Sequence, residues 1–259
     1  MLTLFKNSGL VFNLTKRDIE SRYRGTSLGI VWSLLNPVIM LSIYSFIFGF
    51  VFKAKWGVTT TENYSLIMFA GLLTHGFMAE CIGKATGIYV NNISYVKKVL
   101  FPLETLCWVT VLGSLFQFLM GCLVFAIFCV ILHQPVTITV LLVPLVMLPL
   151  VFLAYSVSLF LSSLGVYVRD MGQIVSVIIA LMLFMSPIFY PVSSVPEKYR
   201  MFIYLNPLTF IVESLRDVVI YGKMFSFQGY SIYWLVCLIV HGLAVMWFNK
   251  VKRGFADVL

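Results

Sequence analysis

Polar and charged residues divide this chain into six long apolar segments. A helix needs roughly 20 apolar residues to cross the ~30 Å hydrocarbon core of a bilayer, and each segment is about that long or longer. The segments cover residues 28–52, 65–83, 106–132, 138–164, 171–190 and 230–248. The pattern predicts an all-α integral membrane protein with six transmembrane helices, forming a single membrane domain over residues 1–259.

The composition fits contact with lipid, because 61% of the residues are hydrophobic and only 11% are charged. A soluble all-α protein with apolar core helices is the alternative, and the helices of such a protein need a polar face. Residues 111–132 are interrupted only by Gly113, Ser114, Gln117 and Gly121. These interruptions do not make a polar face, so the sequence favours the membrane protein.

Lys and Arg are distributed unequally between the two sides of the predicted spans, with twelve of the 18 on one side and six on the other. The twelve are Lys6, Lys16, Arg17, Arg22, Arg24, Lys84, Lys97, Lys98, Arg169, Lys250, Lys252 and Arg253. Because cytoplasmic loops collect Lys and Arg, the bias predicts that both termini are cytoplasmic. The net charge of +8 follows from this bias and from contact with anionic membrane lipid, so no nucleic-acid partner is needed to explain it.

Residues 1–24 precede the first predicted span and mix apolar with basic side chains. This pattern is typical of an amphipathic helix that lies in the membrane interface. The helix either anchors the N-terminus to the inner leaflet or also binds a partner, and the pattern leaves both interpretations open.

Residues 84–104 form the longest predicted cytoplasmic connection, and they have the spacing of a short helix. Asn92 or Ser94 is suited to cap this helix and Pro102 to stop it. Apolar residues such as Ile93 and Val96 then share a face that either binds a soluble partner or packs under the chain's own bundle.

Residues 191–229 separate the fifth and sixth predicted spans and contain a 12-residue apolar run at positions 201–212. Such a run is too short to cross a bilayer, so we expect a re-entrant hairpin on the periplasmic side. Glu213 and Arg216 follow the run at helical spacing, where they can neutralise each other. They are either functional charges near the membrane or solvated loop charges.

The sequence offers no catalytic or metal-binding motif. It has no GxxxxGK[ST] motif for a nucleotide phosphate, and its three histidines and five cysteines form no HExxH or CxxC spacing. No predicted span carries an acidic residue at its centre, which argues against a proton-driven carrier, and no polar groups converge as a membrane-embedded transferase requires. We therefore expect transport with energy supplied by another protein, and no metal or cofactor on this chain.

Several short motifs occur in the order found in one family. Residues 22–37 read RYRGTSLGIVWSLLNP, and further matches lie at residues 97–104, 168–170, 186–190, 204–208 and 253–259. Together these motifs resemble those of type-2 ABC exporter permeases that secrete bacterial surface polysaccharides. The resemblance covers almost the whole chain.

The resemblance implies a permease in the bacterial inner membrane that forms a homodimer and associates with two copies of a separate ABC ATPase, which binds ATP and Mg. It also implies that residues 91–103 of the 84–104 connection form a cytoplasmic coupling helix docked in a cleft of the ATPase. The coupling residues expected on this basis are Asn92, Ile93, Tyr95, Val96, Lys97, Lys98, Leu100 and Phe101, with Arg22 and Arg24 in the interface helix.

The substrate implied by the resemblance is a lipid-linked polysaccharide, either O-antigen or capsule, passing through a channel at the homodimer interface. In the family the first and fifth spans line this channel, and aromatic rings suit contact with sugars. The candidates are Trp32, Tyr44, Phe48, Phe184, Phe189 and Tyr190, with Asn206, Pro207, Glu213 and Arg216 in an outer gate. Each aromatic has the alternative role of packing or facing lipid, and a type-2 exporter of teichoic acid, a drug or a small lipid remains the alternative function.

Overall fold

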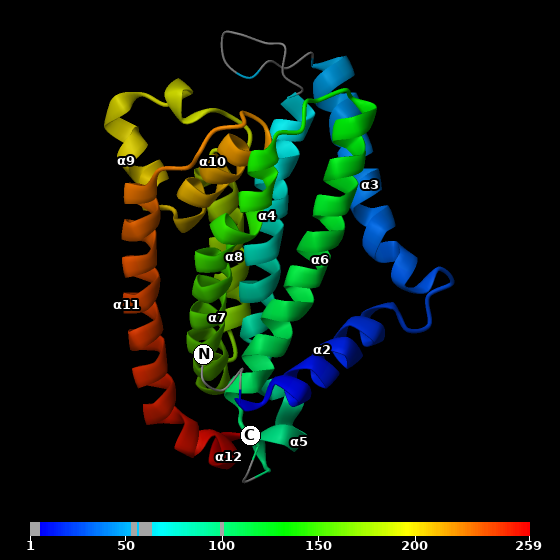
Figure 1. Ribbon diagram of the computed structural model, residues 1–259. Helices are drawn as coiled ribbons and strands as arrows, with labels where there is room; N and C mark the ends of the chain where they lie inside the picture. Colours follow the sequence, from blue (N-terminus) through cyan, green and yellow to red (C-terminus); the bar gives the residue numbers. More distant parts are fainter. Residues whose placement is uncertain (1–5, 53–55, 57–63, 99–100) are drawn as a thin grey trace.

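A computed structural model describes residues 6–52, 56, 64–98 and 101–259 of the chain (Figure 1). Every regular element within these residues is helical, as the sequence predicts. The longest helices run side by side and form one bundle, with shorter helices at its two ends.

Within the described residues, five helical segments are long and apolar enough to cross a membrane. They are Gly29–Val51, which contains α3 (Trp32–Tyr44); α4 (Tyr64–Ala85); α6 (Glu104–Ile131); Ile138–Tyr167, which contains α7 (Val143–Tyr167); and Phe227–Gly254, which contains α11 (Phe227–Val251). The predicted fifth span corresponds to α8 (Met171–Met185), an apolar helix of 15 residues. At 1.5 Å per residue α8 is only about 22 Å long, so a sixth crossing stays a prediction.

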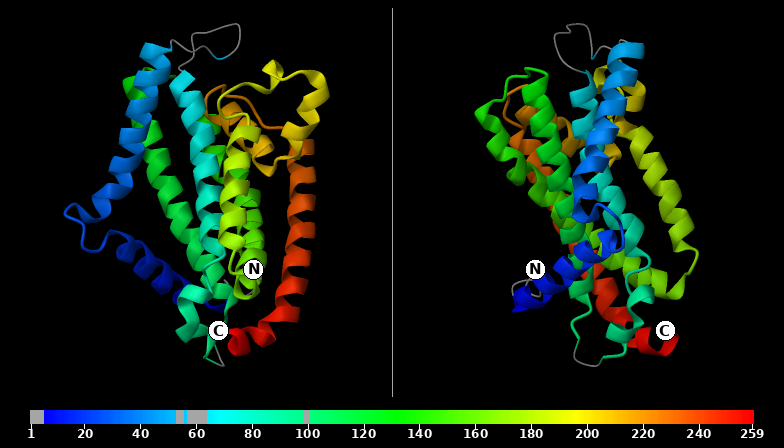
Figure 2. Two further views of the ribbon diagram at one scale, coloured as in Figure 1. Left: turned by 180° about the vertical axis from the view of Figure 1, so that it is seen from behind. Right: turned by 90° about the vertical axis from the view of Figure 1, so that its right-hand side faces the viewer.

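The short helices lie at opposite ends of the bundle (Figure 1). One end carries α2 (Ser8–Tyr23), α5 (Ile93–Val96) and α12 (Phe255–Val258), and we refer to it as the α12 end. The other end carries α9 (Glu197–Leu205) and α10 (Pro207–Val219), and we refer to it as the α10 end. Helix α8 runs between the two ends, as the second view of Figure 2 shows.

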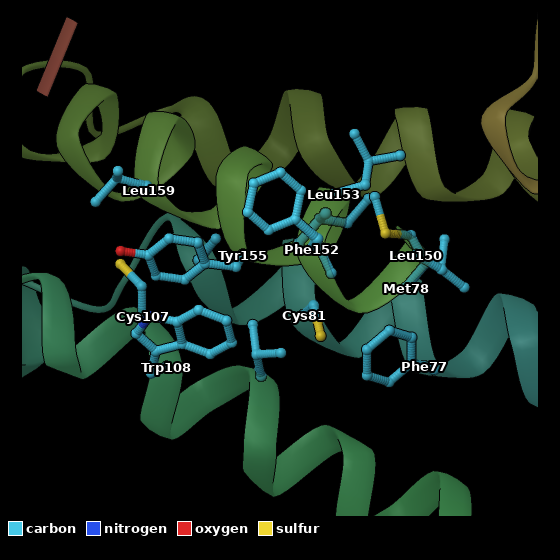
Figure 3. Close-up of a cluster of buried hydrophobic side chains, with 14 of the residues drawn as sticks. Phe77, Met78, Cys81, Cys107, Trp108, Leu150, Phe152, Leu153, Tyr155 and Leu159 are labelled. Atoms are coloured by element: carbon cyan, nitrogen blue, oxygen red, sulfur yellow. The ribbon is translucent and has the colours of Figure 1, made fainter. Parts of the chain in front are cut away.

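Helix α4 is the centre of the bundle, because it packs against α6, α7, α8 and α10. Buried residues make up 67% of its most apolar stretch, against 11% for the first predicted span. Figure 3 shows the core that results, to which α4 contributes Phe77 and Cys81, α6 contributes Trp108 and α7 contributes Tyr155. The Trp108 and Tyr155 rings are stacked with centroids 4.1 Å apart, which gives this part of the core a defined aromatic contact.

Helix α3 lies at the edge of the bundle, on the side opposite to α11 (Figure 1). Its final turns, Ser45–Val51, are wound as a π-helix, and Pro37 lies inside its α-helical part. Gly25 makes the turn from α2 into this span with a positive φ of 85°, a conformation that glycine adopts without steric cost. The turn lets α2 lie obliquely across the α12 end, where it packs on α6 (Figure 2).

Candidate functional site

Helix α2 is attached to the bundle by a cluster of four charges. Arg22 donates to Asp18 Oδ2 at 2.6 Å and to Glu80 Oε1 at 2.5 Å, and Lys84 donates to the same Glu80 oxygen at 2.6 Å. Asp18 and Arg22 are one helical turn apart on α2, and Glu80 and Lys84 are one turn apart on α4. The cluster therefore joins two helices whose sequence positions differ by about 60 residues.

The environment of Arg22 keeps its guanidinium charged. Burial alone lowers its pKa, but Glu80 and Asp18 outweigh this effect and raise the pKa above the usual value. Gly113 of α6 leaves the necessary space, because a Cβ atom there would clash with Arg22 and lie 2.9 Å from Asp18 Oδ2. One turn beyond, the Tyr23 hydroxyl donates to Gln117 Oε1 at 2.9 Å, which extends the contact with α6.

The predicted coupling segment contains a shorter helix than expected. Helix α5 ends at Val96, well before Pro102, and the Asn92 side chain donates to the Ile88 carbonyl instead of capping α5. The Tyr95 and Phe101 rings pack with centroids 4.7 Å apart, and the Lys98 ammonium lies 5.4 Å from the Tyr95 centroid.

The other predicted coupling residues differ in exposure. Val96 is buried within the chain, whereas the exposed members are Ile93, Lys97, Lys98 and Arg24. Leu100 lies outside the described residues. The surface available to a partner is therefore mainly basic, and the buried Val96 belongs to the packing under the bundle that the sequence left as an alternative.

The C-terminal motif holds this segment in place. Phe255 is fully buried, and its ring lies 5.1 Å from the Tyr89 ring, just before the coupling segment. Lys252 lies 3.5 Å from Glu104, which begins α6. A cavity of about 710 Å³ opens between the two regions, and its lining includes Lys98, Phe101, Lys252 and Arg253.

Among the predicted channel aromatics, Tyr44 of α3 and Phe48 of the π-helical turns Ser45–Val51 are connected to Phe189, beyond α8, through Tyr64. The Tyr44 and Phe48 rings are 6.4 Å apart, and Phe48 lies 5.5 Å from Tyr64 at the start of α4. The Tyr64 hydroxyl in turn donates to the Phe189 carbonyl at 2.7 Å. Tyr64 therefore links the α10 ends of the first and fifth predicted spans.

The remaining aromatic candidates are placed differently. Phe184 is 68% exposed on α8, 6.4 Å from the Phe189 ring, and Tyr190 donates to the Phe184 carbonyl at 2.8 Å. Trp32 is partly buried at the opposite end of α3 and is not part of this group. Tyr44 also lines a cavity of about 360 Å³ between α3, α4 and α6, whose polar lining includes Glu80 and Gln117.

The predicted gate residues are tied to the bundle by hydrogen bonds. Asn206 accepts from the Leu208 amide, which caps α10, and donates to Ser186 Oγ at 2.9 Å. Pro207 occupies the first turn of α10, where its missing N–H costs no helical hydrogen bond. The Asn206–Pro207 pair thus starts α10 and joins it to the end of α8.

Arg216 is only 1% exposed, so the solvated-loop interpretation of this charge is wrong. Its guanidinium donates to the Ile67, Pro187 and Ile188 carbonyls. Glu213 lies 3.3 Å from it and remains 44% exposed at its side chain. The predicted pairing of Glu213 with Arg216 is confirmed.

Several residues of these clusters had no role assigned from the sequence. Glu80, Tyr64 and Ile67 meet Arg22, Phe189 and Arg216 across separations of 58, 125 and 149 residues. An acidic residue near the end of a predicted span is the available signal for Glu80. Nothing in the sequence marks Ile67, because it contributes only a backbone carbonyl.

The five long apolar helices found in the described part of the chain define a multi-span membrane protein. Residues 9–220 match the ABC-2 type transporter family, and the chain belongs to this family. It is 29% identical over 258 residues to an O-antigen export system permease protein RfbA of Klebsiella pneumoniae, covering 98% of this chain and 97% of that protein. It is 26% identical over 217 residues to the Myxococcus xanthus RfbA (83% and 82% covered), and 23% identical over 233 residues to the Escherichia coli polysialic acid transport protein KpsM (88% and 89% covered).

These comparisons confirm the family resemblance of the sequence motifs. The relatives are transport proteins by name, two of them permeases for O-antigen and one a carrier of polysialic acid. The two cargoes named, O-antigen and polysialic acid, are both polysaccharides.

Proposed function

We propose that the chain is the membrane subunit of an ATP-driven exporter that moves a lipid-linked polysaccharide, O-antigen or capsule, across the bacterial inner membrane. Two copies form a homodimer with the channel between them, and two copies of a separate ABC ATPase supply the energy. Both termini are cytoplasmic in this proposal, so the α12 end faces the cytoplasm and the α10 end faces the periplasm.

One observation carries the proposal: the similarity to O-antigen export permeases extends over 98% of the chain. Such similarity includes the α12 end, the bundle and the α10 end together. The absence of a GxxxxGK[ST] motif from the sequence supports a separate ATP-binding subunit.

The α12 end has the features that ATPase docking requires. Lys97 and Lys98 are exposed beside the cavity bordered by Lys252 and Arg253, and this basic surface suits an acidic cleft on a partner. Helix α2 touches the same end and is joined to α4 through Arg22 and Glu80. A push on either element would therefore reach the membrane bundle through packed helices or ion pairs.

The bundle supports a channel at a homodimer interface. Helices α3 and α8 expose long apolar faces, and the aromatics Tyr44, Phe48, Phe184, Phe189 and Tyr190 lie on or next to them. We infer that α8 is a sixth crossing, completed by the non-helical residues 186–190. We also infer that α2 lies in the inner membrane interface and that α9 with α10 forms a re-entrant hairpin at the outer mouth.

Deletion of the gene in its native bacterium tests the function. We expect loss of the surface polysaccharide and accumulation of lipid-linked polymer inside the cell. Expression of the intact chain from a plasmid should restore export. The plasmid should fail to restore export in a strain whose partner ABC ATPase carries a substitution of its phosphate-binding lysine, because ATP hydrolysis on that subunit drives the transport.

Two outcomes would overturn the proposal. Normal surface polysaccharide in the deletion strain, with a drug or small lipid retained in the cell, would assign a different cargo. Export by the purified chain in vesicles without any ATPase would remove the proposed energy source.

A further inference from the structure

Helix α8 ends in a way that leaves backbone groups without helical partners. The helix stops at Met185, and Ser186 adopts an extended backbone immediately before Pro187. The carbonyls of Pro187 and Ile188 therefore lie outside any helix, and both residues are buried. Buried carbonyls in this position need a hydrogen-bond donor from another part of the protein.

Arg216 supplies these donors from α10. Its Nη1 atom lies 2.5 Å from the Pro187 oxygen, and its Nη2 atom lies 3.1 Å from the Ile188 oxygen. Its Nε atom donates to the Ile67 carbonyl of α4 at 3.1 Å. One planar guanidinium thus connects three segments, because its donors point in fixed and different directions.

The surroundings of Arg216 are built for this group. The Trp56 ring centre lies 4.4 Å from the guanidinium carbon, close enough for a cation–π contact. On α4, Gly71 leaves room for it, since a Cβ atom there would lie 3.0 Å from Arg216 Nη2 and 3.2 Å from Ile188 Cγ1. Within the described residues its ion-pair partner is Glu213, and that carboxylate is partly exposed.

We propose that Arg216 is a positioning residue that clamps α10 and the broken end of α8 to α4, so that the three segments close the periplasmic mouth as one unit. The proposal rests on the function proposed above. Asn206 reinforces the clamp from the other end of α10 through its bond to Ser186. Without the clamp, α10 is held to the end of α8 mainly by Asn206, and the mouth no longer seals between transport cycles.

The clamp predicts leakage through the resting complex. The assay uses proteoliposomes that contain the complete permease–ATPase complex and entrapped glucose, with no ATP and no polysaccharide. For Arg216→Lys we expect glucose release to rise about tenfold over wild type, because the ammonium cannot bridge three carbonyls in a plane. Assembly with the ATPase should be unchanged, since α10, the helix that carries Arg216, lies at the opposite end of the bundle from α5 and α12 (Figure 1).

Gly71→Ala is a second variant that keeps the arginine. Its Cβ atom crowds the guanidinium, so it should also raise glucose release, by less than Arg216→Lys. Gly242→Ala of α11 is the matched control, because a Cβ atom there meets nothing within 4 Å. We expect the control to release glucose at the wild-type rate.

The outcomes separate the clamp from a purely structural role. Wild-type sealing in both Arg216→Lys and Gly71→Ala would overturn the clamp, as would loss of complex assembly in both variants. Leakage from the variants of a complex that moves no polysaccharide would support the clamp while contradicting the proposed function, since the glucose assay does not depend on the cargo.

Discussion

Glu80 is the residue through which the charge cluster joins α2 to α4. One of its carboxylate oxygens accepts from both Arg22 and Lys84, at 2.5 and 2.6 Å. The side chains of Arg22 and Glu80 are only 17% and 22% exposed, so solvent screens this pair less than an ordinary surface pair. Removing the carboxylate leaves two cations close together without their shared partner.

We predict that Glu80→Gln lowers the free energy of unfolding of the detergent-solubilised protein by about 1–3 kcal/mol, because the charged acceptor of two hydrogen bonds is lost. Thermal unfolding measures this loss. A double-mutant cycle with Arg22→Gln should show an interaction energy of at least about 0.5 kcal/mol, since the two side chains are in direct contact.

The control for this cycle is an exposed ion pair on α2, the helix that carries Arg22. Lys16 and Glu20 are 3.9 Å apart with both side chains more than 60% exposed, at 66% and 63%. Lys16→Ala should change the free energy of unfolding by less than about 0.5 kcal/mol. Strictly additive effects of Glu80→Gln and Arg22→Gln would show that the Arg22–Glu80 bond does not attach α2 to the bundle.

At the scale of helices, one glycine controls how closely α7 approaches the end of α4. A Cβ atom at Gly165 would clash with the backbone carbonyl of Thr86, which follows α4 directly. Backbone cannot move aside as a flexible side chain does, and close helix approach in membranes commonly depends on small residues. Gly165 is also buried, so no outward displacement relieves the clash.

We predict that Gly165→Ala destabilises the protein by about 1–3 kcal/mol, the usual cost of overpacking, although Ala is the better helix former. The measurement is thermal unfolding of the purified variant. Gly242→Ala is again the comparison, and it should be neutral or stabilising because its Cβ atom meets open space. Equal behaviour of the two variants would mean that α7 does not pack this closely on the Thr86 backbone.

The sequence predicted the elements better than their connections. Apolar runs determine where membrane helices form, so five predicted spans appear as helices of sufficient length. The predicted fifth span ends at residue 190, five residues after α8 ends at Met185. Residues 186–190 are mainly apolar, and hydropathy does not register that Ser186 and Pro187 leave the helix. The predicted coupling helix extends to Pro102, whereas α5 ends at Val96. Local spacing does not reveal that the chain turns after Val96 so that Tyr95 packs on Phe101.

The candidate sites were predictable only where a motif or a charge spacing marked them. The motifs contained Arg22 and Asn206, and the helical spacing from Glu213 marked Arg216. The partners of these residues come from distant positions such as Glu80 and Ile67. A backbone carbonyl has no sequence signature, so the role of Arg216 in holding the end of α8 requires the three-dimensional structure.

For the whole molecule, the sidedness of α8 decides the number of crossings. Asp170 precedes α8 and Ser193 follows it, and both are exposed. We predict that, in a chain whose five cysteines are replaced, Ser193→Cys is labelled by a membrane-impermeant maleimide added to periplasm-accessible cells. Asp170→Cys and Thr26→Cys should be labelled only after the inner membrane is opened.

This experiment distinguishes six crossings from five. Labelling of positions 170 and 193 from the same side would show that α8 does not cross. In that case the chain would still be on the cytoplasmic side after α8, and α11 would carry it to the periplasm. The two termini would then lie on opposite faces of the membrane. The basic residues at the α12 end favour the six-crossing arrangement, since they resist translocation.

The two flanks of the bundle differ in what they offer to a second copy. Helix α3 lies on one flank and α11 on the other, and both expose apolar side chains (Figure 1). On α3 and the turns that follow, Phe46 and Phe50 are 61% and 79% exposed, and Phe184 of α8 is 68% exposed. Large exposed aromatics beside the predicted channel residues make the α3 and α8 side the expected homodimer interface.

In a two-fold dimer a residue near the axis faces its own copy, so a single cysteine there can form a disulfide between protomers. We predict that oxidation of native membranes cross-links some single-cysteine variants on the exposed faces of α3 and α8, tested at Phe46, Phe50 and Phe184. Leu238→Cys and Leu243→Cys on α11, 56% and 57% exposed, are the controls and should stay monomeric on denaturing gels. Cross-linking confined to α11 would place the interface on the other flank. A channel bounded by α3 and α8 would then lose its second wall, because that wall must come from the same faces of the partner.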